Sequence, residues 1–355
     1  MPRKPKNPIK EKTDETNSRG VSLKELAAHL GLSPTSLSIV LNDSPAATSI
    51  PQETKDRIFE AAEKFNYRPN YFARSLRAQR SFTFGVLVPE LSDGYSAMVL
   101  NGVESVLSKE GYFYLTASHM HREDLLKHHP QMLLERQVEG IIAVDTPIRF
   151  KPSLPVISVS GHDDVKGVTN IILNHNSAAK LGIEHLYNLG HRKIAFIKGQ
   201  DFSSDTEIRW ETIRQAAKQR GIEIDSDLVV QLEGDIPSPE IGYIAAQKLL
   251  AKNKKFTALF TFNDISAIGA IRALLEVGCR VPEDVSVLGF DDIYAAEFHN
   301  PALTTIRQPL FEMGSLAAQT LLEKLTEQAD GKFVEILTVE PEIIIRQSTA
   351  EASRN

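Results

Sequence analysis

The sequence is poor in the features that mark secreted and membrane-bound proteins. Its 355 residues include a single cysteine, Cys279, which excludes an internal disulfide and favours a reducing, cytoplasmic location. No apolar run approaches the ~18 residues of a membrane span, so no membrane partner is expected. Residues 1–20 are polar and lack an apolar core segment, which predicts a disordered basic tail rather than a signal peptide.

Motifs of catalysis and cofactor binding are also missing. There is no P-loop lysine motif, no nucleophile elbow and no Ser, His and Asp in the chain order of a catalytic triad. Neither an enzyme nor a cofactor is therefore expected. Four histidines gather at His119, His121, His128 and His129, but no two of them stand at i, i+4 on one helix. We therefore expect surface or helix-end histidines and no metal site.

The charges that are present are unevenly distributed. The whole chain has a net charge of −6, yet residues 1–80 carry 14 Lys and Arg against 9 Asp and Glu. The remainder carries 26 against 37. A basic end on an acidic body suits a protein that touches phosphate at one end only.

Residues 21–69 have the pattern of a helix-turn-helix domain. A capping box at Ser22–Glu25 starts one helix, and Gly31 ends it. The pair Ser33-Pro34 starts a second helix that runs to about Leu41. Two short helices around a glycine turn predict that the second helix lies in the major groove of DNA.

A third helix is expected to begin near Pro51 and to bury Ile58, Phe59, Ala62 and Phe65. The arginine-rich segment 70–80 follows it. An isolated helix of that length is marginal in water, so we expect this segment to become ordered on DNA.

The run LKELAAHLGLSPTSLSIVLN, followed by ETKDRIFEAAEKFNYRPNYFARSLR, resembles the headpiece and hinge of the LacI/GalR (lactose-repressor) family of bacterial regulators. The resemblance continues to about Ser348. In that family the hinge helices of a homodimer lie together in the minor groove of an operator, and a leucine wedges into the central base step. Leu76 matches that leucine, and Ala73 matches the small residue at which the paired hinges approach.

The family's base-reading positions fall on Pro34, Thr35 and Ile39. Pro34 has no backbone donor and Ile39 replaces a polar residue, so the resemblance does not imply an operator sequence. The residues expected to contact double-stranded DNA are Ser22, Ser33, Pro34, Thr35, Ser36, Ser38, Ile39, Asn42, Tyr67, Asn70, Ala73, Arg74, Leu76 and Arg77.

From residue 82 onward, strands alternate with helices in two successive runs. Near-continuous apolar strands predict parallel sheets that are covered on both faces, and two such runs predict two facing lobes. The fold class is therefore α/β, and the family's core resembles periplasmic sugar-binding proteins. The expected parts, in chain order, are a tail (1–20), a helix-turn-helix headpiece (21–69), a hinge helix (70–81), a core (82–348) and a second tail (349–355). The core is expected to be two-lobed and periplasmic-binding-protein-like, with doubly wound parallel sheets. Its first lobe should comprise about 82–172 and 307–335, and its second lobe about 173–306 and 336–348.

Polar side chains follow the strands of both lobes, where ligands of such sheets bind. Carboxylates, amides and an arginine fork suit a polyhydroxylated small molecule, most simply a sugar. By resemblance, Arg209, Asn263 and Asp291 match the family's sugar contacts, and Tyr95 and Ser96 match first-lobe contacts.

An aromatic that purine- and sugar-binding members often use is replaced here by Ile236, and Trp210 is the expected substitute. Asp264 and Asp292 are expected to cap helices instead of binding ligand. The residues expected to bind the effector are Tyr95, Ser96, Asp145, Arg209, Trp210, Ile236, Asn263 and Asp291.

These patterns together predict a ligand-responsive, sequence-specific transcription regulator, a repressor that binds two half-sites as a homodimer. Residues 346–355 lack apolar heptads, so a tetramer is not expected. Two alternatives stay open. The body alone permits a solute-binding receptor, and an acidic pair at a strand end permits an enzyme.

Overall fold

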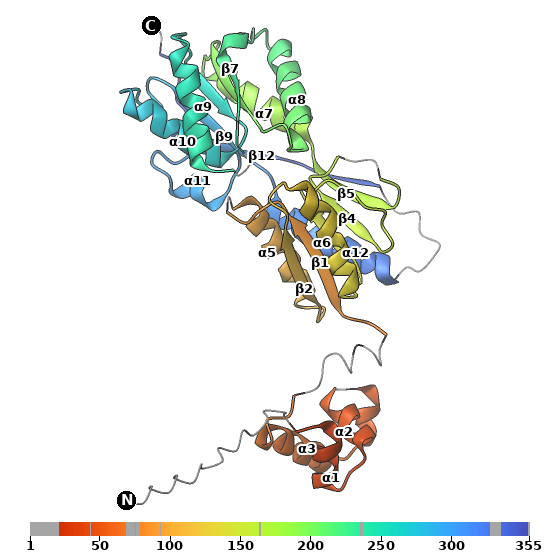
Figure 1. Cartoon of the computed structure of the whole chain (residues 1–355). Coiled ribbons are helices and arrows are strands. Elements are labelled where there is room, and N and C mark those ends of the chain that lie inside the picture. Colours follow the sequence, from red (N-terminus) through yellow and green to blue (C-terminus); the bar gives the residue numbers. More distant parts are fainter. Residues whose placement is uncertain are drawn as a thin grey trace, which may run out of the picture. The chain divides into compact units, whose positions relative to one another are not determined.

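The computed structural model describes residues 21–42, 44–68, 75, 79–92, 94–162, 165–234, 237–326 and 335–353. The chain forms two compact units, Met1–Arg80 and Ser81–Asn355. We call the first unit the headpiece and the second unit the sensor body (Figure 1). Within the described residues, no helix has both the length and the apolarity needed to cross a membrane.

The headpiece is helical throughout its described core. Its helices are α1 (Leu23–Leu30), α2 (Pro34–Leu41), the 3₁₀ turn η1 (Pro45–Ser49) and α3 (Gln52–Lys64). The predicted caps are confirmed: Ser22 and Glu25 form a capping box, Ser33 accepts from the amide of Ser36, and Gly31 ends α1 with a φ of 65°. The turn η1 lies in the connection between α2 and α3.

The headpiece core is small and lies between the three α-helices. Leu26, Leu37 and Ile58 are fully buried at its centre. Phe59, which was expected in this core, is 51% exposed. Neighbouring residues on a helix point about 100° apart, so the helix face that buries Ile58 turns Phe59 outward.

The first lobe of the sensor body is a six-stranded parallel sheet in the order β11-β5-β4-β3-β1-β2. Its strands are β1 (Thr83–Val88), β2 (Phe113–Ser118), β3 (Ile141–Val144), β4 (Val156–Val159), β5 (Val168–Leu173) and β11 (Ile336–Val339). Helices α5 (Tyr95–Leu107) and α12 (Leu310–Thr326) pack on one face, and α6 (Glu123–Glu135) packs on the other. The predicted two-sided cover is confirmed.

The second lobe repeats this plan with the strand order β12-β10-β9-β8-β6-β7, in which only β12 is antiparallel. Its strands are β6 (Ile194–Lys198), β7 (Val229–Gln231), β8 (Ala258–Thr261), β9 (Ser286–Asp291), β10 (Thr304–Arg307) and β12 (Glu342–Ile344). Its helices are α7 (His175–Asn188), α8 (Asp205–Gln219), η2 (Ser226–Leu228), α9 (Pro239–Ala251), α10 (Asp264–Glu276) and α11 (Tyr294–Phe298).

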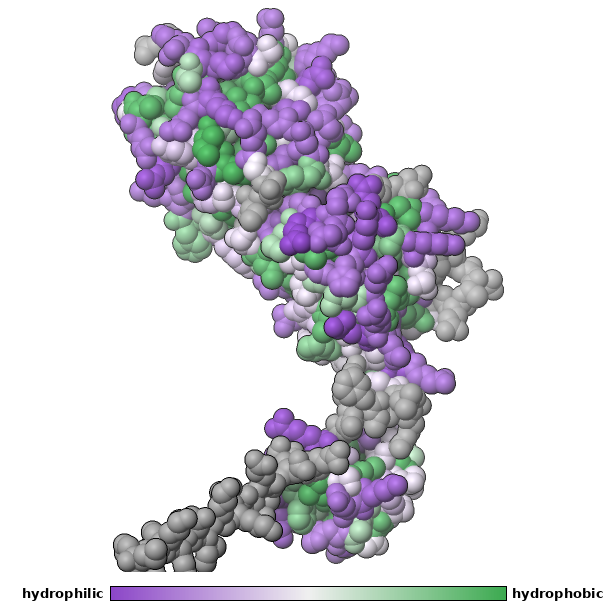
Figure 2. Space-filling view, in the orientation of Figure 1, coloured by the Kyte–Doolittle hydropathy of each residue, from purple (hydrophilic) through white to green (hydrophobic). Residues whose placement is uncertain are grey.

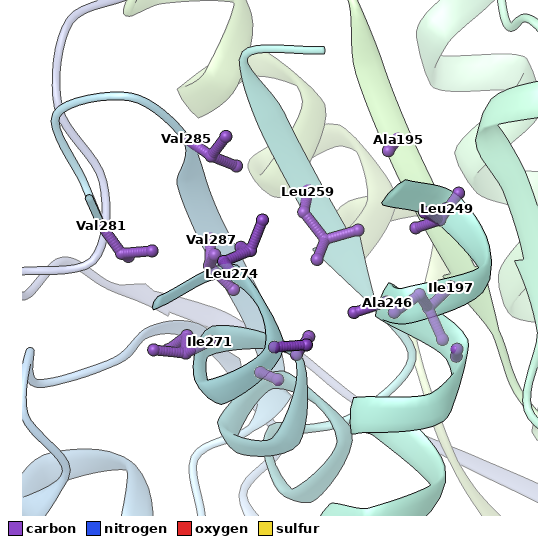
Figure 3. Close-up of a cluster of buried hydrophobic side chains, with 14 of the residues drawn as sticks. Ala195, Ile197, Ala246, Leu249, Leu259, Ile271, Leu274, Val281, Val285 and Val287 are labelled. Carbon is purple, nitrogen blue, oxygen red and sulfur yellow. The ribbon is translucent and has the colours of Figure 1, made fainter. Parts of the chain in front are cut away.

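Each face of the second sheet has its own apolar core. Figure 3 shows one of them, in which Leu249 of α9 and Leu274 of α10 meet Leu259 and Val287 of the central strands. The opposite face packs against α7 and α8. Outside these cores the face shown in Figure 2 is largely hydrophilic, with hydrophobic residues in small separate groups.

The chain passes between the lobes three times, after β5, after β10 and after β11. Two of these crossings are tied together, since the Asn174 amide donates to the Glu340 carboxylate at 2.9 Å. The prediction that the second lobe resumes at residue 336 is wrong, because strand β11 (Ile336–Val339) pairs with β5 in the first lobe. The predicted division at residues 172–173 falls within the last two residues of β5.

The C-terminal residues belong to the second lobe instead of forming a tail from residue 349. The amide of Ala352 donates to the Leu189 carbonyl at 2.7 Å, and His185 contacts the Thr349 hydroxyl at 3.0 Å. These bonds hold the end of the described chain against α7.

Candidate functional site

The second helix of the headpiece has the exposed N-terminus that groove binding requires. Pro34 and Thr35 are exposed, and Ile39 is half-buried. The Ser33 hydroxyl caps α2 and lies 2.9 Å from the Ser36 hydroxyl. Ser33 therefore has a structural role in α2 besides its predicted contact with DNA.

Other predicted DNA contacts also have partners inside the headpiece. Ser22 is the N-cap of α1, and the Asn42 amide donates to the Ser38 carbonyl at 2.7 Å. Tyr67 is half-buried against the core. Contact with DNA remains a prediction for all of these residues. The predicted contacts Asn70, Ala73, Arg74, Leu76 and Arg77 lie outside the described residues.

The sensor body has one cleft where the carboxyl ends of strands from both sheets meet. Its free volume is about 40 Å³, room for only a few water molecules. A ring-sized ligand therefore needs the lining side chains or the lobes to move apart. The lining residues are Pro89, Glu90, Tyr95, His121, Asp145, Gln200, Phe202, Ser203, Asp205, Arg209, Pro237, Phe262, Asn263 and Asp291.

Arg209 is the centre of the second-lobe wall. It lies on the first turns of α8, is only 4% exposed, and donates to Asp205 and to the carbonyl of Phe262 at 2.7 and 2.6 Å. Its guanidinium also stacks 3.8 Å from the ring centroid of Phe290. Ion pairing and ring contacts fix the plane of the guanidinium, so that it is held as a rigid fork.

Asp291 and Asn263 complete this wall from the ends of two neighbouring strands. Asp291 ends β9, and one of its carboxylate oxygens accepts from the Gln308 amide at 2.7 Å and lies 3.9 Å from Arg209. Asn263 follows β8 and caps α10 by accepting from the amide of Ser266. The predicted trio of Arg209, Asn263 and Asp291 is thus brought together in one cleft.

The first lobe supplies the opposite wall. Tyr95 begins α5, and its hydroxyl lies 2.5 Å from the Ser160 hydroxyl after β4. Asp145 follows β3 and accepts from Ser204 of the second lobe at 3.0 Å. The Ser204 hydroxyl also lies 2.6 Å from the carbonyl of Ser160. One serine hydroxyl thereby links the two walls.

The backbone is strained at the strand ends that face this cleft. Asp145, Ser160 and Asp291 have φ angles of 38°, 57° and 107°, although none of them is glycine. Each such conformation costs roughly 1–3 kcal/mol and persists only where the surrounding structure enforces it. Such strain concentrates at functional sites, which agrees with a ligand role for this edge.

The carboxylates of the cleft differ in their proton affinity. Burial, together with the charge of Asp205, raises the pKa of Asp145 to about 6. Burial, Asp205 and Asp145 raise the pKa of Tyr95 well above its usual range. Burial alone would raise the pKa of Asp205 as well, but His175, His162 and Arg209 hold it well below normal. The cleft therefore contains one firmly ionised carboxylate beside one that is easily protonated.

Two of the predicted effector contacts are absent from the described lining of this cleft. Ser96 is buried within the first turn of α5, and Trp210 packs edge-on against Phe196 with ring centroids 5.5 Å apart. Trp210 follows Arg209 on α8, so the two side chains leave the helix about 100° apart. Ile236 lies outside the described residues.

Besides the predicted Tyr95, the aromatic surface of the cleft comes from two residues that the sequence did not single out. Phe262 stands directly before Asn263, and Phe202 lies in the loop before α8. Phe262 had a detectable signal, because it follows the last residue of an apolar strand. Phe202 had none, because loop residues have no periodic pattern that gives their direction.

The prediction that Asp264 and Asp292 cap helices is wrong. The cap of α10 is Asn263, while Asp264 is fully buried and accepts from the Ile293 amide and the Thr305 hydroxyl at 2.9 and 2.5 Å. Asp292, the residue after β9, instead forms ion pairs with Arg307 and Arg346. Both carboxylates therefore bind neighbouring segments of the second lobe, on β10 and around β9, instead of capping helices.

The histidine group also differs from expectation. His119 is 1% exposed, not a surface residue, and burial followed by the charge of His121 lowers its pKa to about 4. His121 lines the cleft and packs at a tilt against Phe202 with ring centroids 3.9 Å apart. His128 is exposed as predicted.

Comparisons with known proteins point in the same direction as this geometry. A family model for a periplasmic binding protein-like domain matches residues 183–349. The HTH-type transcriptional repressor PurR of Pasteurella multocida is 32% identical over 337 residues, which are 92% of this chain and 98% of that protein. The repressor of the same name from Haemophilus influenzae is 32% identical over 338 residues, with the same coverage.

Solved structures extend the similarity to the fold. A structure of the Lac repressor bound to ONPG in the repressed state has a TM-score of 0.81 at 25% identity and covers 93% of this chain and 100% of that one. A LacI family transcriptional regulator from Enterococcus faecium with bound ribose has a TM-score of 0.67 at 27% identity. It covers 76% of this chain and 100% of that one.

Proposed function

Because the chain belongs to the LacI/GalR family of bacterial transcriptional regulators, we propose that it is an operator-binding repressor with a sugar effector. The headpiece binds a pseudo-palindromic operator, and the cleft of the sensor body binds the small molecule. Similarity to the PurR repressors extends over 92% of the chain, which favours a regulator over a transport receptor or an enzyme.

The placement of Arg209, Asn263 and Asp291 in one cleft carries the sugar proposal. A carboxylate and an amide accept from and donate to adjacent hydroxyls, and the guanidinium presents a planar set of donors. The rings of Phe262 and Tyr95 supply flat apolar surface beside these polar groups. A polyhydroxylated ring with one apolar face fits both halves of this set. The similar regulator with bound ribose supports the same class.

DNA reading is proposed for the N-terminal half of α2. Thr35 is exposed and offers a hydroxyl, while Ile39 offers only apolar contact of the kind that a thymine methyl accepts. Phosphate contacts from the positively charged N-terminal region add affinity that carries no sequence information. By family resemblance, Leu76 is the apolar wedge of the hinge.

The response to ligand is proposed to act through the fit between the two lobes. Ser204 joins Asp145 and Ser160 across the cleft, so a ligand placed there must alter or replace this link. A ligand changes DNA affinity only if it binds the DNA-competent and DNA-incompetent arrangements unequally. We propose that the hydrogen bonds from Ser204 to Asp145 and Ser160 form in one of these arrangements and break in the other.

Homodimer formation is proposed to use the exposed aromatic residues of α11. Tyr294 and Phe298 are 68% and 82% exposed, although both are large and partly or wholly apolar. Contiguous exposed apolar patches mark protein interfaces, and Tyr294 and Phe298 stand one helical turn apart on the same face of α11. A dimer would also match the two-fold symmetry of a pseudo-palindromic operator. Sedimentation of the Phe298→Ser variant tests this, and an unchanged dimer would exclude α11 from the interface.

The effector proposal is tested with a thermal-shift screen of the full-length protein against monosaccharides, disaccharides and, as a comparison class, purine bases. A ligand present at 100 times its Kd stabilises the folded state by about 2.7 kcal/mol, which a melting curve resolves. We expect a sugar to raise the Tm of the wild type and to have no such effect on Asp291→Asn. Asp284→Asn, which removes a carboxylate from an exposed ion pair, is the matched control and should respond normally.

The screen separates the two parts of the proposal. A response to a purine base that Asp291→Asn abolishes would retain the cleft and overturn the sugar class. A sugar response that Asp291→Asn leaves intact would overturn the cleft assignment.

A further inference from the structure

Three residues that lie far apart in the sequence meet at the junction of the two lobes. His162 follows β4 in the first lobe, His175 begins α7, and Asp205 begins α8 in the second lobe. The Nε2 atoms of His162 and His175 lie 2.7 and 3.3 Å from the same Oδ1 atom of Asp205. The three candidate ligand atoms all lie within 4.8 Å of one another.

Two imidazoles and one carboxylate make a recognised ligand set for divalent transition metals such as zinc. The second carboxylate oxygen of Asp205 is held by the Arg209 guanidinium at 2.7 Å. Outer contacts of this kind orient the ligating oxygen and keep the carboxylate ionised. The position is also well shielded, since Asp205 and His175 are 5% and 4% exposed.

Within the described chain, the buried ring nitrogens of His175 lack the hydrogen-bond partner that such groups normally have. Its Nε2 approaches Asp205 without hydrogen-bond geometry, and neither ring nitrogen has a hydrogen-bond partner among the described residues. A buried polar group left in this way costs about 1–3 kcal/mol and calls for an explanation. A metal ion would supply a partner for one of the two nitrogens.

The charge around the cluster is also suitable for a cation. Asp145 and Asp291 line the same cleft as Asp205 and add negative charge near the cluster. Arg209 is the opposing charge, but it is paired with Asp205 and lies close to Asp291. Three protein ligands would leave a coordination position for water.

We propose that His162, His175 and Asp205 form a binding site for a divalent transition-metal ion that ties the two lobes together beside the effector cleft. His162 is the only one of the three that comes from the first lobe, so an ion on all three ligands requires the lobes to be closed at this edge. The ion therefore stabilises one lobe arrangement in preference to an open one. This site is independent of whether the effector is a sugar.

The test uses untagged full-length protein that has been stripped with a chelator. Co²⁺ is titrated while its visible d–d absorption is followed, and Zn²⁺ affinity is then measured by competition. We expect saturable binding at one site per chain and a rise in Tm with either ion. Loss of even an outer-shell partner weakens metal binding by about 10–100-fold, so His162→Gln should weaken it by at least about 100-fold.

Matched variants separate this site from other histidines. His175→Gln should behave like His162→Gln, whereas His128→Gln, which removes an exposed histidine outside the cluster, should bind as the wild type does. A wild type that binds neither ion, or a His162→Gln variant that binds with unchanged affinity, would overturn the proposal and leave the cluster as a proton-sharing ion pair. If the variants do not fold, an anomalous zinc signal between the three side chains of the wild type supports the site, and its absence in zinc-soaked crystals overturns it.

Discussion

Asp264 should make the stability of the sensor body depend on pH in a direction opposite to that of an ordinary carboxylate. It is fully buried, and burial raises its pKa from 3.8 to about 7, although bonds from Thr305 and from the Ile293 amide oppose that change. The folded state therefore binds a proton more tightly than the unfolded chain does. The resulting stability is fully present below about pH 4 and is lost as the pH rises through 7.

The size of this effect follows from the two pKa values. The difference between 3.8 and about 7 corresponds to roughly 4 kcal/mol at about 1.4 kcal/mol per pH unit. Asp264→Asn is neutral at every pH; its single oxygen accepts from the Ile293 amide, and its NH2 group donates to the Thr305 hydroxyl. Relative to the wild type, we therefore expect its free energy of unfolding to increase by up to roughly 4 kcal/mol between pH 4 and pH 8.

Urea unfolding at a series of pH values measures this difference. Trp210 is the single tryptophan of the chain and packs in the second lobe against Phe196, so its fluorescence reports on the lobe that contains Asp264. Asp284→Asn is the control, because the Arg280 ion pair lowers the pKa of Asp284 to about 2 and its effect is confined to acid pH. If the difference in unfolding free energy between Asp264→Asn and the wild type stays constant from pH 5 to pH 8, Asp264 does not have the raised pKa.

Three further predictions concern packing and the hinge. Gly102→Ala should lower the Tm, because its Cβ would lie 2.0 Å from the Phe311 carbonyl oxygen where α5 crosses α12. In the headpiece, Ile58→Ala should cost about 2–5 kcal/mol of unfolding free energy in chemical denaturation, whereas Phe59→Ala should change it little. Leu76→Ala should weaken specific DNA binding more than non-specific binding in titrations with operator and random duplexes; equal weakening would exclude the wedge role.

Local signals in the sequence were sufficient for much of the fold. The capping box at Ser22 and the left-handed Gly31 are short-range features, and both occur where the pattern predicts them. The alternation of apolar strands and helices likewise indicated two doubly wound lobes. It did not reveal β5, because no helix separates β4 from β5 and the alternation is broken there. The strand β11 was assigned to the wrong lobe, because pairing partners are not encoded in a single strand.

The cleft was predictable only in part for similar reasons. Strand ends are easy to locate, so Asp145, Asn263 and Asp291 were identified from their positions. The direction of a side chain on a helix is harder to infer, and Trp210 proved to be half-buried against Phe196 instead of lining the cleft. The cluster around Asp205 joins residues from both lobes, so no spacing in the sequence marks it.

Operator binding and its control by a sugar are tested together by selecting DNA sites from a random pool with the purified full-length protein, in the presence and absence of sugar mixtures. We expect a recovered pseudo-palindrome whose yield changes with one sugar in the wild type and not in Asp291→Asn. A palindrome whose recovery no sugar alters would contradict the sugar assignment. Recovery of no enriched sequence at all would contradict the reading of the headpiece as an operator-binding domain.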